Sequence, residues 1–123
     1  MADYQKLEVY QRAYKLAVEV YKFSLTLPKS LQHDVADDIR RASRSIPSNI
    51  AEGYGRNKSE KDKANLLGDA LGSNDEILFN LKFLNDIQLI NQSLYQRLFE
   101  EYTITGKQLF SLIRTIKKPD ASN

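Results

Sequence analysis

The sequence contains no cysteine and only one histidine, His33, in 123 residues. Without cysteine the chain cannot form disulfide bonds, thiolate metal sites or a cysteine nucleophile. A single histidine also excludes multi-histidine metal sites and the di-iron bundles that use two Glu-x-x-His pairs. We therefore expect neither a metal ion nor any other cofactor.

Glycine and proline are scarce as well, with five and three residues respectively. An all-β fold needs turn residues about every 8–12 positions, so the scarcity of glycine and proline favours helices. No apolar run approaches the roughly 20 residues that span a bilayer, and the opening MADYQKLEVY lacks the basic-then-apolar pattern of a secretion signal. We expect a cytoplasmic protein with no membrane partner. The net charge of +2 is too small to identify a partner by itself.

Apolar residues recur at alternating steps of three and four in four stretches, which is the pattern of one helix face. The stretches cover residues 8–27, 31–55, 59–86 and 93–118, with short connections between them. Short connections place consecutive helices antiparallel. The sequence therefore predicts an all-α fold, an up-down antiparallel four-helix bundle that forms one domain over 1–123 with an ordered core at about 4–118. The residues expected in its core are Phe23, Ile39, Ile50, Leu67, Leu81, Leu98, Leu109 and Leu112.

Proline, serine and glycine mark the ends and irregular points of these helices. Pro47 lies inside the second stretch, where it removes a backbone donor and predicts a kink. The alternative is a break, with a new helix starting at Pro47. Ser59 and Ser93 are predicted to cap the third and fourth helices. Gly68 and Gly72 share one face of the third helix. Each glycine lowers the stability of the helix by about 1 kcal/mol relative to alanine. Close approach of a neighbouring helix usually compensates for this loss.

Seven basic residues between positions 40 and 63 form a candidate nucleic-acid-binding surface, here called the basic strip. Its members on the second helix, in the following loop and at the start of the third helix are Arg40, Arg41, Arg44, Arg56, Lys58, Lys61 and Lys63. A clustered basic strip is typical of phosphate binding. Asp37, Asp38 and Glu52, however, lie three or four residues before arginines of the strip, which is the spacing of helix ion pairs. Ion pairing or subunit contact therefore stays open as a second interpretation.

No combination of residues predicts an enzyme. His33, Asp34, Asp37 and Asp38 do not share one helix face as metal ligands must, and acidic residues at a helix N-terminus are the simpler interpretation. The serines around Pro47 have no base at a suitable spacing. Helical-bundle RNases of the HEPN class carry an arginine four to six residues before a histidine, and no arginine stands there before His33.

The first helix carries more aromatic surface than one core stripe needs. Tyr10, Tyr14 and Tyr21 lie beside the stripe, and the last helix is widened in the same way by Phe99 and Phe110. Wide aromatic faces on a soluble protein usually mark contact with another chain. We therefore expect a homo-oligomer with the three tyrosines at or near the subunit contact, although neighbouring helices of the same bundle could close part of this width.

The segment DIRRASRSIPSNIAEGYGR, residues 38–56, resembles the signature Q-I-R-R-A-A-x-S-I-P-S-N-I-A-E-G-x-x-R of the four-helix-bundle proteins encoded in 23S rRNA intervening sequences. The opening helix at 7–21 and the segment at 70–76 also resemble that family, so the resemblance covers about residues 4–118. Asp38, Arg44 and Asn74 depart from its usual residues. The motif residues that we interpret as structural are Pro47, Ser48, Asn49, Glu52 and Gly53.

This resemblance implies a closed bundle of four long helices and a ring-like homopentamer, without an established activity. A structural relative of the family, the accessory protein of diversity-generating retroelements, binds nucleic acid and a reverse transcriptase, which is an analogy at the level of the fold. We predict a non-enzymatic oligomeric accessory protein that binds RNA or DNA through the basic strip. The alternative is a scaffold that contacts another protein and binds no nucleic acid.

Overall fold

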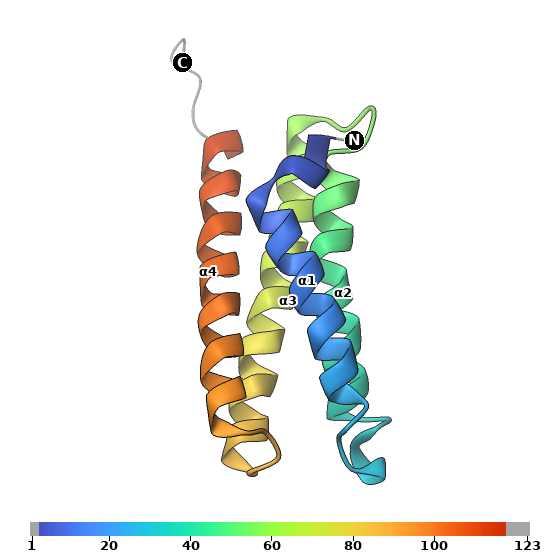
Figure 1. The fold of residues 1–123 in the computed structure, drawn as a ribbon. Coiled ribbons are helices and arrows are strands. Elements are labelled where there is room, and N and C mark those ends of the chain that lie inside the picture. Colours follow the sequence, from blue (N-terminus) through green and yellow to red (C-terminus); the bar gives the residue numbers. More distant parts are fainter. Residues whose placement is uncertain (1–2, 118–123) are drawn as a thin grey trace.

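The computed structural model describes residues 3–117, and this part of the chain is an all-helical bundle without strands (Figure 1). Its four α-helices are α1 (Glu8–Ser24), α2 (Val35–Gly53), α3 (Glu60–Asp86) and α4 (Gln92–Lys117). Two short 3-10 helices, η1 (Asp3–Lys6) and η2 (Lys29–Leu31), precede α1 and α2. Consecutive helices run antiparallel, which confirms the predicted fold class. The predicted end of the last helix at Lys118 lies outside the described residues.

The core lies along the inner faces of all four helices. Six of the eight residues predicted to lie in it are fully buried, namely Ile39, Ile50, Leu67, Leu81, Leu98 and Leu109. Phe23 and Leu112 are only half-buried and pack against the edge of the core. The prediction of full burial was wrong for these two because each lies close to the end of its helix, where fewer side chains surround it.

Several helix ends differ from the sequence prediction, and the second helix ends at Gly53 instead of residue 55. The first helix ends at Ser24, and the Gln32 side chain donates hydrogen bonds to the main-chain oxygens of Ser24 and Leu27 (2.8 and 2.9 Å), which holds the following turn. The second helix begins at Val35 because residues 29–31 form the separate helix η2. The fourth begins at Gln92, since the cap is the Asn91 carboxamide oxygen and not Ser93.

Polar side chains join the helices at several points. The Ser59 hydroxyl caps α3 by accepting a bond of 3.0 Å from the main-chain nitrogen of Asp62, as predicted. α2 runs through Pro47 without interruption, so the alternative of a new helix starting there was wrong, while the kink stays a prediction. Ser45 on α2 contacts Ser73 on α3 through their hydroxyls at 2.8 Å, which ties these two helices together.

Candidate interaction surface

An apolar groove of about 420 Å³ runs between the outer faces of α1 and α2, and we call it the α1–α2 groove. Small side chains, among them Ala17 and Ala51, form part of its lining, while tyrosines on α1 give it aromatic surface. Its full lining consists of Tyr10, Tyr14, Ala17, Val18, Tyr21, Lys22, Arg44, Pro47, Ser48 and Ala51. The groove therefore brings together the tyrosines predicted at the subunit contact, one residue of the basic strip and two residues of the family motif.

The tyrosines of the groove leave much of their surface in solvent. Tyr14 is 55% exposed and Tyr21 is also exposed, whereas Tyr10 is half-buried because Tyr4 from η1 packs edge-on against it, with ring centroids 4.9 Å apart. The Tyr10 and Tyr14 rings lie 6.0 Å apart, centroid to centroid. Burial, with smaller contributions from Tyr4 and Tyr14, raises the pKa of the Tyr10 hydroxyl above its usual value. The phenol is therefore neutral at physiological pH and adds no charge to the groove.

The charged residues of the groove are all basic. Lys22 and Arg44 line it, and the lining includes no acidic side chain. Within residues 3–117 neither side chain makes an ion pair or a hydrogen bond with another residue of the chain. The groove is thus an apolar surface with two cations whose charges are not neutralised from within the described part of the molecule.

Arg40 of the basic strip forms hydrogen bonds within the bundle. Its guanidinium donates hydrogen bonds to the Ser24 hydroxyl (2.9 Å) and to the side-chain and main-chain oxygens of Gln32 (3.0 and 2.7 Å). These bonds join α2 to the end of α1. Arg41 instead forms ion pairs with Asp37 (3.6 Å) and Asp38 (2.8 Å), as the helix spacing predicted.

Two lysines of the strip are also paired with carboxylates. Lys58 lies 4.0 Å from the Glu52 carboxylate, and Lys63 lies 3.6 Å from Glu60, with its ammonium 4.6 Å from the centre of the Tyr54 ring. The predicted pairing of Glu52 with Arg56 was wrong, because α2 ends at Gly53 and the helical spacing of four residues no longer applies beyond it.

Three residues of the strip remain without such a partner: Arg44, Arg56 and Lys61 make no ion pair or hydrogen bond within the described residues. They lie on α2, in the α2–α3 loop and in the first turn of α3 respectively. Nucleic-acid binding by the strip stays a prediction, now centred on these three side chains.

The family motif serves several parts of α2. Pro47 and Ser48 line the groove, whereas Asn49 donates a hydrogen bond of 2.9 Å to the Ser45 hydroxyl, on the side that contacts α3. Gly53 is buried at the end of α2, and a Cβ atom there would lie 3.6 Å from the Cβ of Leu66 on α3. One continuous motif therefore contributes to the groove and to the packing of α2 on α3.

Sequence analysis missed a second exposed apolar surface, on the outer face of α3. Phe79 is 69% exposed, and Phe83 and Ile87 are exposed beside it. Their spacing of four residues, outside the core stripe, was the signal that could have revealed them. No neighbouring helix of the described residues approaches Gly68 or Gly72, since apart from the adjoining backbone of α3 no atom comes within 4 Å of a Cβ atom built at either glycine.

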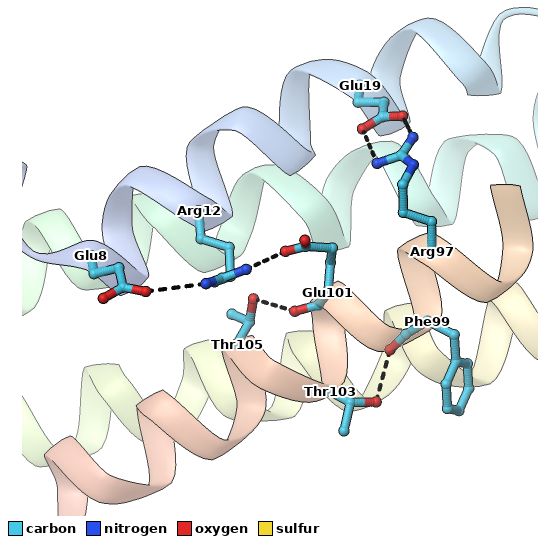
Figure 2. A network of polar contacts seen from close by, with 8 residues as sticks. All are labelled: Glu8, Arg12, Glu19, Arg97, Phe99, Glu101, Thr103 and Thr105. Atoms are coloured by element: carbon cyan, nitrogen blue, oxygen red, sulfur yellow. Dashed lines mark hydrogen bonds and ion pairs between the residues drawn. The ribbon is translucent and has the colours of Figure 1, made fainter.

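The opposite side of α1 is occupied by a polar network with α4, shown in Figure 2. Arg12 pairs with Glu8 at 3.1 Å and reaches across to Glu101, while Arg97 on α4 pairs with Glu19 through two contacts. These ion pairs close the bundle between α1 and α4. The exposed aromatic side of α1 therefore faces away from α4, towards α2 and solvent.

Residues 3–117 contain neither a metal-binding cluster nor a membrane-spanning helix. No group of three or more His, Asp or Glu side chains in this range is arranged to hold a metal ion. None of the helices in this range is both long and apolar enough to cross a membrane.

The sequence and the fold were compared with those of known proteins. The crystal structure of a protein of unknown function from the S23 ribosomal protein family of Bacteroides thetaiotaomicron is similar, with a TM-score of 0.76 and 27% sequence identity. The similarity covers 86% of this chain and 95% of that chain. No curated protein matched the sequence. A family model described as the 23S rRNA-intervening sequence protein matches residues 5–111. The chain therefore belongs to the 23S rRNA-intervening sequence protein family, whose function is not established.

Proposed function

We propose that this protein is a non-enzymatic accessory protein that assembles with copies of itself, and that the α1–α2 groove is a contact surface of the assembly. The observation that carries the proposal is the exposure of Tyr14 and Tyr21 along an apolar groove. Soluble monomers rarely leave such contiguous apolar surface in water, and tyrosine is enriched at protein interfaces. Family membership supports a ring-like homopentamer as the assembled state.

Sedimentation of a groove variant and a matched control tests this proposal. Tyr14→Ser removes an exposed aromatic ring from the groove, and Phe110→Ser removes one of similar exposure from α4, outside the groove. Truncating an aromatic anchor of an interface typically raises the dissociation constant roughly tenfold or more. We expect Tyr14→Ser to shift assembly to higher concentration and Phe110→Ser to leave it unchanged. An equal shift in Phe110→Ser would place the wide aromatic face of α4 in the subunit contact as well. Equal sedimentation of both variants and the wild type would argue against the groove.

A second function, binding of RNA or DNA, is favoured by the three cations of the basic strip that lack internal partners. Arg44, Arg56 and Lys61 are free to neutralise phosphate, which gives affinity but little sequence specificity. In an assembly every copy repeats Arg56 and Lys61, which lie outside the groove lining, so a long nucleic acid would bind several copies at once and with higher avidity.

Binding to labelled RNA and DNA over a salt series tests the second function. The triple variant Arg44→Glu, Arg56→Glu and Lys61→Glu should bind RNA and DNA much more weakly than the wild type. The affinity that remains should depend less on salt concentration. A control with the same change of charge, Lys15→Glu, Lys29→Glu and Lys107→Glu, alters exposed lysines outside the strip and should bind nearly as the wild type. Equal loss in both triple variants would show a response to net charge alone. No binding by the wild type at low salt would leave the scaffold as the function.

A further inference from the structure

The outer face of α3 carries a row of exposed apolar side chains that extends to Ile87, the residue directly after the helix. We call this row the α3 ridge: Phe79, Phe83 and Ile87. Residues four apart on a helix lie on the same face about 6 Å apart along the axis, so the three side chains form one raised line. A phenylalanine as exposed as Phe79 has no packing role within the chain. Its exposure indicates a surface that another molecule covers.

The same face of α3 carries no side chain at two positions, Gly72 and Gly68, about two and three turns before Phe79. At 100° per residue, Gly68 and Gly72 lie within about 20° of Phe79 around the helix axis. Each glycine destabilises the helix by about 1 kcal/mol relative to alanine, and no atom of the described chain comes close enough to benefit from the missing Cβ. A helix of another molecule could approach α3 closely at these two positions.

The ridge and the groove carry opposite free charges. Asp75 and Glu76 are exposed four and three residues before Phe79, and neither carboxylate pairs with a cation within residues 3–117. The groove presents Lys22 and Arg44 without a carboxylate. Apolar surface faces apolar surface and anions face cations if the ridge of one copy enters the groove of another.

We propose that the α1–α2 groove of one copy of this protein binds the α3 ridge of a second copy. The inference rests on the proposed self-assembly and names the surface that fills the groove. Phe79 and Phe83 pack against the groove tyrosines, and Asp75 and Glu76 lie near Lys22 and Arg44.

The positions of the charges also set the direction in which α3 enters. Because Arg40 bonds to Ser24 and the two helices are antiparallel, Arg44 lies one turn further along α2, beside the Lys22 end of the groove. The acidic residues precede Phe79 on α3, so this end of the ridge lies at the Lys22 end. The incoming α3 therefore runs antiparallel to α1 of the copy that binds it.

This contact is heterologous, since it joins two different surfaces. Each copy has one groove and one ridge, so a contact between two copies leaves one of each free, and further copies add head to tail until the rotation closes a ring. A groove-to-groove contact would instead produce a symmetric dimer and leave the ridge exposed.

Mixing two variants distinguishes these arrangements. Tyr14→Asp disables the groove and Phe79→Asp disables the ridge, and because both side chains are exposed, each variant should fold with a helical circular dichroism spectrum. We expect each variant alone to need a roughly thirtyfold higher concentration for half-assembly than the wild type. An equimolar mixture still contains one intact pair of surfaces and should form a heterodimer of twice the 14.1 kDa chain mass.

Site-specific cross-linking gives a second measurement that does not depend on the affinity of one interface. The chain has no cysteine, so introduced thiols are unique. A short thiol-specific cross-linker should join Ser48→Cys in the groove lining of one copy to Lys82→Cys beside the ridge of another. Lys15→Cys, an exposed position on α1 outside the groove lining, replaces Ser48→Cys in the control and should give little product with Lys82→Cys.

The outcomes separate this inference from the function on which it rests. A monomeric wild type would overturn both. A wild type that assembles, together with a Phe79→Asp variant that assembles equally well, would overturn the ridge and leave the groove. Cross-linking of Ser48→Cys with itself in preference to Lys82→Cys would show a groove-to-groove contact and overturn the inference. Loss of RNA binding in Tyr14→Asp, with assembly intact in both variants, would identify nucleic acid as the occupant of the groove and overturn it as well.

Discussion

Asn74 on α3 donates a hydrogen bond of 2.8 Å from its Nδ2 atom to the main-chain oxygen of Tyr102 on α4. The asparagine is only 1% exposed, so the bond lies in the core between two helices that pack side by side. Gly106, one turn after Tyr102, leaves room for the amide, because a Cβ atom there would lie 2.9 Å from the same Nδ2 atom. The glycine and the asparagine therefore form one unit that fixes how α3 and α4 meet.

Alanine at position 106 should destabilise the protein even though alanine is the better helix former. The new Cβ displaces the Asn74 amide and breaks its bond to Tyr102, which costs roughly 1–3 kcal/mol and exceeds the gain of about 1 kcal/mol in helix propensity. Gly72→Ala is the matched control, since its Cβ meets open space and should stabilise the isolated chain by up to about 1 kcal/mol. Urea unfolding of both variants measures the difference. Equal stabilisation by the two alanines would contradict the role given to Asn74.

Arg40 and Arg41 are neighbours in the sequence but should differ in their contribution to stability. Arg40→Ala removes three hydrogen bonds that join α2 to the α1–α2 turn and should lower the free energy of unfolding by roughly 1–3 kcal/mol. Arg41→Ala removes exposed ion pairs and should change it by less than about 1 kcal/mol. Chemical denaturation compares the two. An Arg41→Ala variant as unstable as Arg40→Ala would show that the hydrogen bonds of Arg40 contribute no more to the free energy of unfolding than exposed ion pairs do.

Leu81 and Phe79 lie two residues apart on α3, but truncation should lower the stability of the protein only at Leu81. Leu81→Ala empties a fully buried position and should cost about 2–5 kcal/mol, because the surrounding core closes the cavity only in part. Phe79→Ala removes an exposed side chain and should leave the stability of the dissociated chain within about 0.5 kcal/mol of the wild type. Thermal unfolding at a concentration where the protein is dissociated measures both effects. A large loss in Phe79→Ala under these conditions would place this side chain in the core.

Tyr102 should make the fold sensitive to alkaline pH. Burial raises the pKa of its hydroxyl far above the usual value of about 10. Above that pH the unfolded chain loses the proton while the folded chain keeps it, so stability is fully present below about pH 10 and falls as the pH rises further. The hydroxyl also has no hydrogen-bond partner among the described residues. Tyr102→Phe should therefore raise stability at neutral pH by about 1 kcal/mol and weaken the alkaline loss. Unfolding at pH 7 and pH 11 by denaturant tests this, and an unchanged pH dependence would contradict it.

The sequence predicted the bundle because its apolar stripes are long and regular, and local spacing alone identifies them. Helix ends were less predictable, since the end of α1 depends on Gln32 bonding back to Ser24, a contact formed only after the chain turns. The hydrogen bonds of Arg40 were not predicted for the same reason, because its partners lie eight and sixteen residues away and meet it only in the folded chain.

The candidate surface was half predictable. The tyrosines of α1 exceeded what one stripe needs, and the structure places them along a groove. Phe79 and Phe83 were not predicted, although their spacing of four residues outside the core stripe of α3 indicates a second apolar face. Their exposure in the structure separates them from the core residues. The expected close approach of a neighbouring helix to Gly68 and Gly72 does not occur among residues 3–117, which leaves this face of α3 open to a helix of another copy.

The central claim, that this protein assembles with itself, is tested most directly by the molar mass of the wild-type protein in solution. Light scattering coupled to size-exclusion chromatography at micromolar concentration gives that mass without a variant or a label. We expect a mass of five times the 14.1 kDa chain mass, which is the mass of a homopentamer. A different multiple would contradict only the subunit number. A mass near 14.1 kDa over the whole micromolar range would contradict self-assembly through the groove.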